Sequence, residues 1–153
     1  MIFKHLSFAV SIAFISWIVG MLVNVFLRKT EFHANNLTHL NFIKNEKLNK
    51  FIGLGFFKWI VKNTFFKFFN QKLKIKKRIE NADLVKLREE MTISEIDHLV
   101  GFVFVTCFAI VSFYNFKFIA GGIMMLINVL MNLYPSLLQQ ENKRRIDQFL
   151  SKF

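Results

Sequence analysis

The chain contains few of the residues that build disulfide-bonded or loop-rich domains. Its 153 residues include one cysteine (Cys107), one proline (Pro135), six glycines and ten acidic residues. A single cysteine excludes an intrachain disulfide, and nothing in the sequence indicates an oxidising compartment. There is no internal repeat, no low-complexity linker and no Gly-x-Ser-x-Gly motif. We therefore expect one compact unit, and a serine nucleophile has no support from the sequence.

The chain is rich in apolar residues and in positive charge. It is 54% hydrophobic with 21 phenylalanines, and its formal net charge is +11. Soluble domains do not normally combine such apolarity with such charge, whereas membrane proteins with basic cytoplasmic flanks do. The composition therefore predicts a membrane protein.

Three apolar stretches are long enough to cross a bilayer as helices: residues 6–27, 99–116 and 118–138. The first exceeds the apolar run of a signal peptide, and Arg28-Lys29 closes it as a stop-transfer signal does, so we expect an uncleaved span. Lys117 separates the other two, which predicts a tight helical hairpin. The expected fold is all-α and integral to the membrane, with residues 1–153 as a single membrane domain.

Charge predicts the direction of the spans. Residues 28–98 hold 15 Lys and Arg against 8 Asp and Glu, and the tail from 139 holds 4 against 2. The amino-terminal end has only Lys4, and the hairpin tip only Lys117. The positive-inside rule then predicts a multi-pass protein of the cell membrane, with its amino terminus outside and its carboxyl terminus in the cytoplasm.

Residues 51–70 are predicted to form a basic amphipathic helix in the membrane interface. This stretch is rich in phenylalanine, and Lys58, Lys62 and Lys67 interrupt it, which suits apolar burial with lysines reaching the headgroups. The sequence leaves open whether it re-enters the membrane. The following segment, residues 71–98, is expected to be cytoplasmic and basic, with a helical pattern from about 82 that continues into the second span.

Glu95 and His98 lie at the start of the second span, three residues apart and hence on one side of a helix. One interpretation is a general base, His98, with a carboxylate that orients it. The alternative is an interfacial histidine beside a solvated Glu95. The remaining histidines are scattered, so we expect no metal site.

A line of polar residues follows the third span at helical spacing: Asn128, Asn132, Ser136, Gln139 and Asn142. The line favours either a functional surface or interhelical hydrogen bonds. Pro135 is expected to free the carbonyl of Met131. Arg145 follows the line and suits phosphate or carboxylate binding, whereas Lys143 and Arg144 are interpreted as positive-inside anchors.

Three motifs resemble the glycosyl-4,4'-diaponeurosporenoate acyltransferases, a family of small membrane enzymes, over roughly residues 53 to 146. Gly55 with Lys58-Trp59 is similar to that family's Gly-x-x-x-(Trp/Phe)-Lys, and Ser94-Glu95-Ile96-Asp97-His98 to its (Ala/Ser)-Glu-x-x-His. Residues 132–139 match its Asn-x-(Tyr/Pro)-Pro-x-x-x-Gln, with Asn142 and Arg145 in the expected continuation. Gln140-Glu141 and Lys143-Arg144 depart from the family pattern, and we expect differences in substrate at the Gln140-Glu141 stretch.

The resemblance implies transfer of a fatty acyl group to a hydroxyl of a lipid or glycolipid, such as a carotenoid glycoside. His98 would be the base and Glu95 its orienting partner. The residues expected to bind substrate are Asn132, Tyr134, Gln139, Asn142, Arg145 and Lys58, with Asn132 and Gln139 at the acyl carbonyl and Arg145 and Lys58 at a phosphate.

The partners expected on this basis are membrane lipids, an acyl donor (acyl-CoA, an acyl carrier or a phospholipid) and a hydroxylated lipid acceptor. We expect neither a cofactor nor nucleic acid. The sequence leaves open homo-oligomers and hetero-oligomers. Two alternatives also stay open: a non-catalytic membrane subunit that binds a partner through the polar face of the third span, and a lipid hydrolase.

Overall fold

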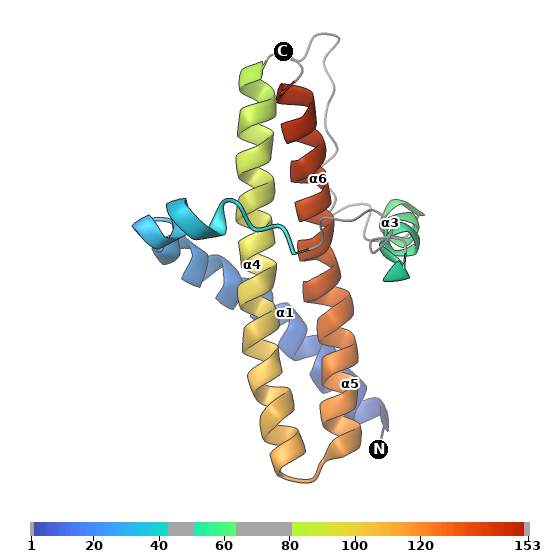
Figure 1. The fold of residues 1–153 in the computed structure, drawn as a ribbon. Coiled ribbons are helices and arrows are strands. Elements are labelled where there is room, and N and C mark those ends of the chain that lie inside the picture. Colours follow the sequence, from blue (N-terminus) through green and yellow to red (C-terminus); the bar gives the residue numbers. More distant parts are fainter. Residues whose placement is uncertain (1, 43–50, 64–80, 152–153) are drawn as a thin grey trace.

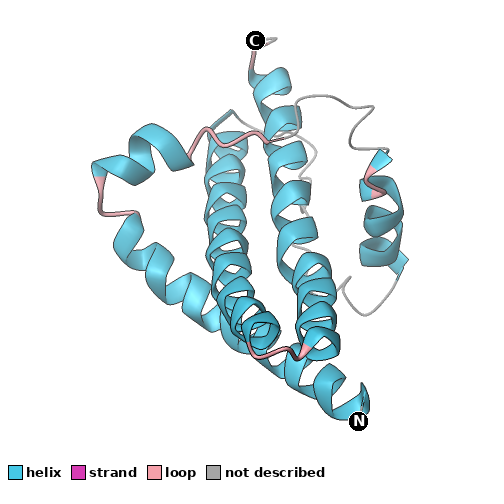
Figure 2. Cartoon of the chain, turned by 60° about the horizontal axis from the view of Figure 1, so that its bottom comes forward, coloured by secondary structure: helices cyan, strands magenta, loops and turns pink. Residues whose placement is uncertain are grey.

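The computed structural model describes residues 2–42, 51–63 and 81–151. Its helices are α1 (Ile2–Leu27), α3 (Leu54–Asn63), α4 (Asn81–Tyr114), α5 (Phe118–Asn128) and α6 (Tyr134–Leu150), with π-helical turns η1 (His33–Leu37) and η3 (Val129–Leu133). In Figure 1, α4 stands beside the continuous run α5–η3–α6, and α1 crosses this pair obliquely. Figure 2 shows η1 and α3 on opposite sides of the pair.

Three helical stretches are long and apolar enough to span a membrane: Ile2–Leu27, Asn81–Tyr114 and Phe118–Leu150. This confirms the predicted all-α membrane fold, and the protein is therefore a membrane protein. Large apolar side chains such as Phe14 and Ile18 are exposed on α1, while the small or polar Ala13, Ser16 and Asn24 are buried. That distribution is the one a bilayer favours, because lipid covers apolar surface and small residues let helices approach.

Small residues mark the places where α1 approaches its neighbours. A Cβ added to Gly20 would collide with the backbone carbonyl of Asp97 on α4. A Cβ added to Gly101 would lie 2.9 Å from Oδ1 of Asn132 and 3.1 Å from the Ser16 carbonyl. Glycine at these two positions allows the oblique crossing, which brings α1, α4 and η3 into direct contact.

The helical hairpin turns at residues 115–117, where Phe116 adopts a left-handed φ of 57° and the Lys117 N–H donates to the Ser112 carbonyl at 2.9 Å. This turn and the amino-terminal end of α1 lie at the same end of the molecule, and α6 ends at the other (Figure 1). The fold is thus compatible with an amino terminus and a hairpin tip on one side of a membrane.

The helices extend beyond the predicted spans. Helix α1 begins at Ile2, and α4 joins the predicted cytoplasmic helix to the second span without a break. The third span continues through η3 and α6 to Leu150. Helix α3 occupies part of the predicted interfacial helix, of which residues 64–70 lie outside the described residues. Residues 71–80 of the basic segment lie outside them too.

Candidate functional site

A cavity of about 280 Å³ lies where α1, α3, α4 and the η3–α6 junction meet. Ser94, Asp97 and His98 of α4 and Gln139 of α6 provide its polar lining. The remaining lining is apolar: Trp17 and Met21 from α1, Phe57 and Val61 from α3, and Leu130, Met131, Pro135 and Leu138. Such a cavity can hold apolar chains beside a few polar groups.

His98 is held on this wall by ring packing. The Trp17 indole meets the imidazole edge to face, with ring centroids 5.9 Å apart and planes at 89°. The Nδ1 atom of His98 is buried and lacks a well-formed hydrogen bond among the described residues, and the Asn132 side chain lies close enough to interact with the imidazole. A buried polar atom without a well-formed hydrogen bond is costly, and a hydroxyl group is the kind of ligand group that would satisfy it.

Pro135 determines how Trp17 is placed. Proline has no N–H to donate to the carbonyl four residues earlier, that of Met131. The Trp17 indole Nε1–H donates to this carbonyl at 3.2 Å, and the backbone widens into the π-helical turn η3 just before the proline. The predicted free carbonyl of Met131 is therefore confirmed, and it orients the aromatic ring that packs on His98.

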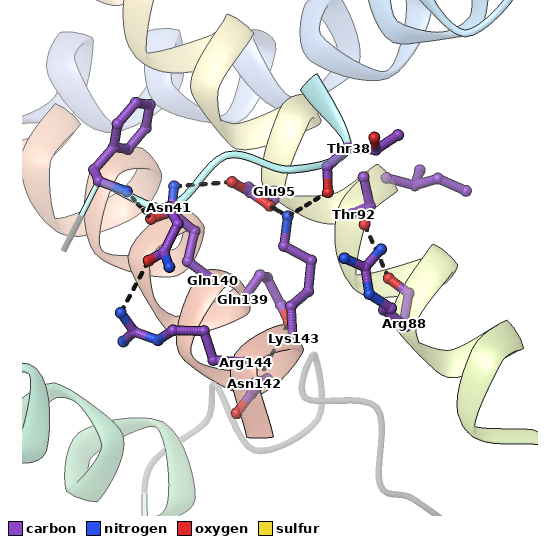
Figure 3. Close-up of polar contacts among 12 residues, drawn as sticks. Thr38, Asn41, Arg88, Thr92, Glu95, Gln139, Gln140, Asn142, Lys143 and Arg144 are labelled. Atoms are coloured by element: carbon purple, nitrogen blue, oxygen red, sulfur yellow. Dashed lines mark hydrogen bonds and ion pairs between the residues drawn. The ribbon is translucent and has the colours of Figure 1, made fainter. Parts of the chain in front are cut away.

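Glu95 does not hold the His98 imidazole, so this part of the prediction is wrong. The carboxylate is fully buried, forms an ion pair with Lys143 of α6, and accepts a hydrogen bond from Gln140 Nε2 at 2.8 Å (Figure 3). Residues three apart on a helix point about 60° away from each other. That difference directs Glu95 to α6, and a buried carboxylate pairs with the cation it finds there.

Lys143 was predicted to be a surface anchor, and this prediction is wrong. It is only 3% exposed and also donates to the Thr38 carbonyl at 3.4 Å. Gln140 Oε1 accepts the Phe42 N–H at 2.9 Å, and Arg144 donates to Asn41 at 2.9 Å (Figure 3). These hydrogen bonds hold residues 38–42 against the place where α4 and α6 meet.

The asparagines of the third span serve helix packing. Asn128 Nδ2 donates to the Phe102 carbonyl at 2.9 Å and to Thr106 Oγ1 at 3.1 Å. Asn132 Nδ2 donates to Ser16 Oγ at 3.0 Å and to Asn128 Oδ1 at 2.9 Å. Both N–H groups of Asn132 are thus used within the chain, and its role at an acyl carbonyl stays a prediction. Since both amides are buried within this chain, they do not form a surface for a partner helix.

Two predicted substrate-binding residues, Tyr134 and Lys58, connect α6 with α3 and the residue Ile52 just before it, whereas Arg145 forms its ion pair within α6. The Tyr134 hydroxyl donates to the Ile52 carbonyl, and its ring lies 5.1 Å from that of Phe57. Lys58 and Arg145 both pair with Glu141, the latter at 2.8 Å. They lie close together as predicted, but their charges face a carboxylate of the chain itself. The contacts of Tyr134 and Lys58 hold the wall of the cavity that α3 provides.

Gln139 is the predicted substrate-binding residue that lines the cavity. Asn142 Nδ2 donates a long hydrogen bond of 3.5 Å to Gln139 Oε1. This contact orients the amide and leaves its Nε2 atom able to donate to a ligand. Asn142 therefore acts on the cavity through Gln139.

Sequence reasoning missed Trp17 and Asp97. Asp97 lines the cavity beside His98, and its Oδ1 accepts a hydrogen bond from Asn24 Nδ2 at 2.7 Å. The same amide group donates to the Ile93 carbonyl at 3.0 Å. An asparagine within the first apolar span was the available signal, because an amide in lipid needs a partner on a neighbouring helix.

Comparison with known proteins agrees with this architecture. The family model described as glycosyl-4,4'-diaponeurosporenoate acyltransferase matches residues 24–152, which include the polar lining of the cavity and exclude Trp17. Neither the curated proteins nor the solved structures contain a match. The match covers most of the chain and identifies an acyltransferase that acts with an acyl donor and a lipid acceptor. The protein therefore belongs to the glycosyl-4,4'-diaponeurosporenoate acyltransferase family.

Proposed function

We propose that the protein transfers a fatty acyl group to a hydroxyl of a glycolipid in the cavity beside His98. The observation that carries the proposal is the His98 imidazole on the wall of a largely apolar cavity, where its buried Nδ1 atom lacks a well-formed hydrogen bond. The family match supports the acyl group and a carotenoid glycoside-like acceptor. Following the charge distribution, we place this cavity toward the cytoplasmic face of the cell membrane, with the amino terminus outside.

His98 acts as the base in the proposed reaction. The acceptor hydroxyl oxygen attacks the acyl carbonyl carbon while the imidazole takes the hydroxyl proton. The bond between the acyl carbon and the carrier of the donor then breaks, and the imidazole returns the proton to the leaving group. The donor is an acyl-CoA, an acyl carrier or a phospholipid, and the step requires no further cofactor.

Two polar neighbours complete the proposed chemistry. Gln139 donates its Nε2–H to the oxygen of the tetrahedral intermediate, where a placed donor is worth most. Asp97, oriented by Asn24, accepts a second hydroxyl of the acceptor sugar. The apolar wall formed by Trp17, Phe57 and Leu138 receives the hydrocarbon chains.

The test is to express His98→Ala and His98→Gln in cells that supply the acceptor, and to measure acylated glycolipid by mass spectrometry. Each change should lower product formation about 100-fold or more at equal protein level, because a positioned base contributes that much. Cys107→Ser, an exposed mid-span residue away from the cavity, is the control and should retain activity. Undiminished product with His98→Ala would refute the base assignment, and release of free fatty acid without acylated acceptor would identify a hydrolase.

A further inference from the structure

A second, larger cavity of about 570 Å³ lies between the carboxyl end of α1, η1 and the first half of α4. Arg28, Lys29 and Arg88 provide its basic lining, and Val25, Val85 and Ile93 part of its apolar lining. On α4, Arg88 and Thr92 point on average about 120° away from Ser94 and His98 at 100° per residue. Both cavities border α4, but they share no lining residue.

Positive charge dominates this cavity. Arg28 and Lys29 are exposed, and neither forms an ion pair among the described residues, although Lys29 also lies over the Phe26 ring at 5.9 Å. Arg88 is fixed by Asp147, which binds it through both carboxylate oxygens. Glu89 is the acidic residue in the lining. The charge of Arg88 is thus offset by Asp147, and the two cations Arg28 and Lys29 against Glu89 leave a net positive site suited to a phosphate group.

His33 adds a buried polar atom without a partner. Its Nε2 atom is enclosed and has no hydrogen-bond partner in the described part of the chain, and His33 belongs to the lining. Burial first, and the nearby Arg28 charge second, lower the pKa of His33 below its usual value. The imidazole is therefore neutral near pH 7, and a phosphate oxygen or hydroxyl is the kind of group that would satisfy it.

We propose that this cavity binds the phosphate headgroup of an anionic membrane phospholipid. Arg28 and Lys29 follow directly on the apolar run of α1, at the depth where headgroups meet hydrocarbon. Guanidinium groups bind phosphate oxygens in bidentate fashion, and the valines and Ile93 can cover the first part of the acyl chains. The inference goes beyond the proposed acyl transfer, since the lipid binds in a cavity that shares no lining residue with the cavity of His98 and does not react.

The experiment measures lipid retention by native mass spectrometry of the full-length protein, released from nanodiscs of phosphatidylglycerol and phosphatidylcholine. Phosphatidylglycerol should be retained at least tenfold more strongly, and Arg28→Gln with Lys29→Gln should lower its apparent affinity about tenfold or more. The matched control removes two exposed charges outside the cavity, Lys86→Gln with Lys117→Gln, and should change affinity less than twofold. An equal loss in the control pair would show diffuse attraction and overturn the site.

Two further experiments test whether this cavity is the binding site and whether it binds a lipid. Glu89→Gln should strengthen phosphatidylglycerol retention a few-fold, whereas Asp83→Asn, which removes a negative charge from the first turn of the same helix, should not. Inorganic phosphate and glycerol phosphate should fail to displace the lipid at millimolar concentration. Displacement by them would show a site for free phosphate and overturn the lipid assignment. Acyl transfer is followed in parallel, so a failure here is distinguishable from a failure of the His98 proposal.

Discussion

At the scale of single residues, the fold depends on small side chains that let neighbouring helices approach closely. Gly20 lets α1 touch the backbone of α4 at Asp97, next to His98. Glycine is normally unfavourable inside a helix, by roughly 0.5–1 kcal/mol relative to alanine. Its presence at this crossing is explained by the contact and not by helix propensity.

Gly20→Ala should therefore destabilise the protein by about 1–3 kcal/mol, because the added methyl group meets backbone that cannot rotate away. The measurement is thermal unfolding of the purified protein in detergent. Gly122→Ala is the matched control, since a Cβ there meets nothing within 4 Å, and it should be neutral or slightly stabilising. Equal melting temperatures for the two variants would contradict the close crossing.

At the scale of elements, the buried ion pair between Glu95 and Lys143 joins α4 to α6. Both side chains are nearly inaccessible, and Gln140 and the Thr38 carbonyl complete their hydrogen bonding. The pair leaves the carboxylate unavailable to His98 and gives Glu95 a positioning role. The half-exposed pair of Arg88 and Asp147 joins the same two helices farther toward the end of α6.

Lys143→Met alone should lower the free energy of unfolding by about 3–5 kcal/mol, because it leaves a buried carboxylate without its cation. Adding Glu95→Gln to it should restore most of that loss, since the remaining groups are neutral. Chemical unfolding in detergent measures the free energy of unfolding of the single and the double variant. Asp147→Asn, which breaks the exposed pair, should cost no more than about 1 kcal/mol. A double variant as unstable as the sum of its single changes would contradict the buried pair.

At the scale of the whole molecule, the membrane class, the three spanning helices and the family could be predicted from the sequence. Hydropathy, charge and short motifs are local properties of the sequence, so they can be recognised without knowledge of the fold. The ion pair between Glu95 and Lys143 could not be predicted from the sequence. Lys143 lies in another helix, and its neighbours in the sequence are those of an ordinary basic segment flanking a span. The same applies to Trp17, whose only role visible in the sequence is that of an apolar residue in a span.

The orientation of the chain in the membrane remains a prediction, and cysteine labelling tests it. In a Cys107→Ser background, Lys117→Cys should react with a membrane-impermeant maleimide on intact cells, because it occupies the hairpin tip. Lys86→Cys should react only after the cells are opened. Both lysines are exposed, so accessibility within the protein is matched. Labelling of Lys86→Cys in intact cells would reverse the assigned topology.

Helix α4 borders both cavities, and this has a thermodynamic consequence. Ser94 and His98 line one cavity, and Arg88 and Thr92 line the other. Any free-energy coupling between ligands at the two places must be reciprocal. If an anionic lipid strengthens acceptor binding by some factor, the acceptor strengthens retention of that lipid by the same factor. The lipid composition of the surrounding leaflet would then act as an effector of the enzyme.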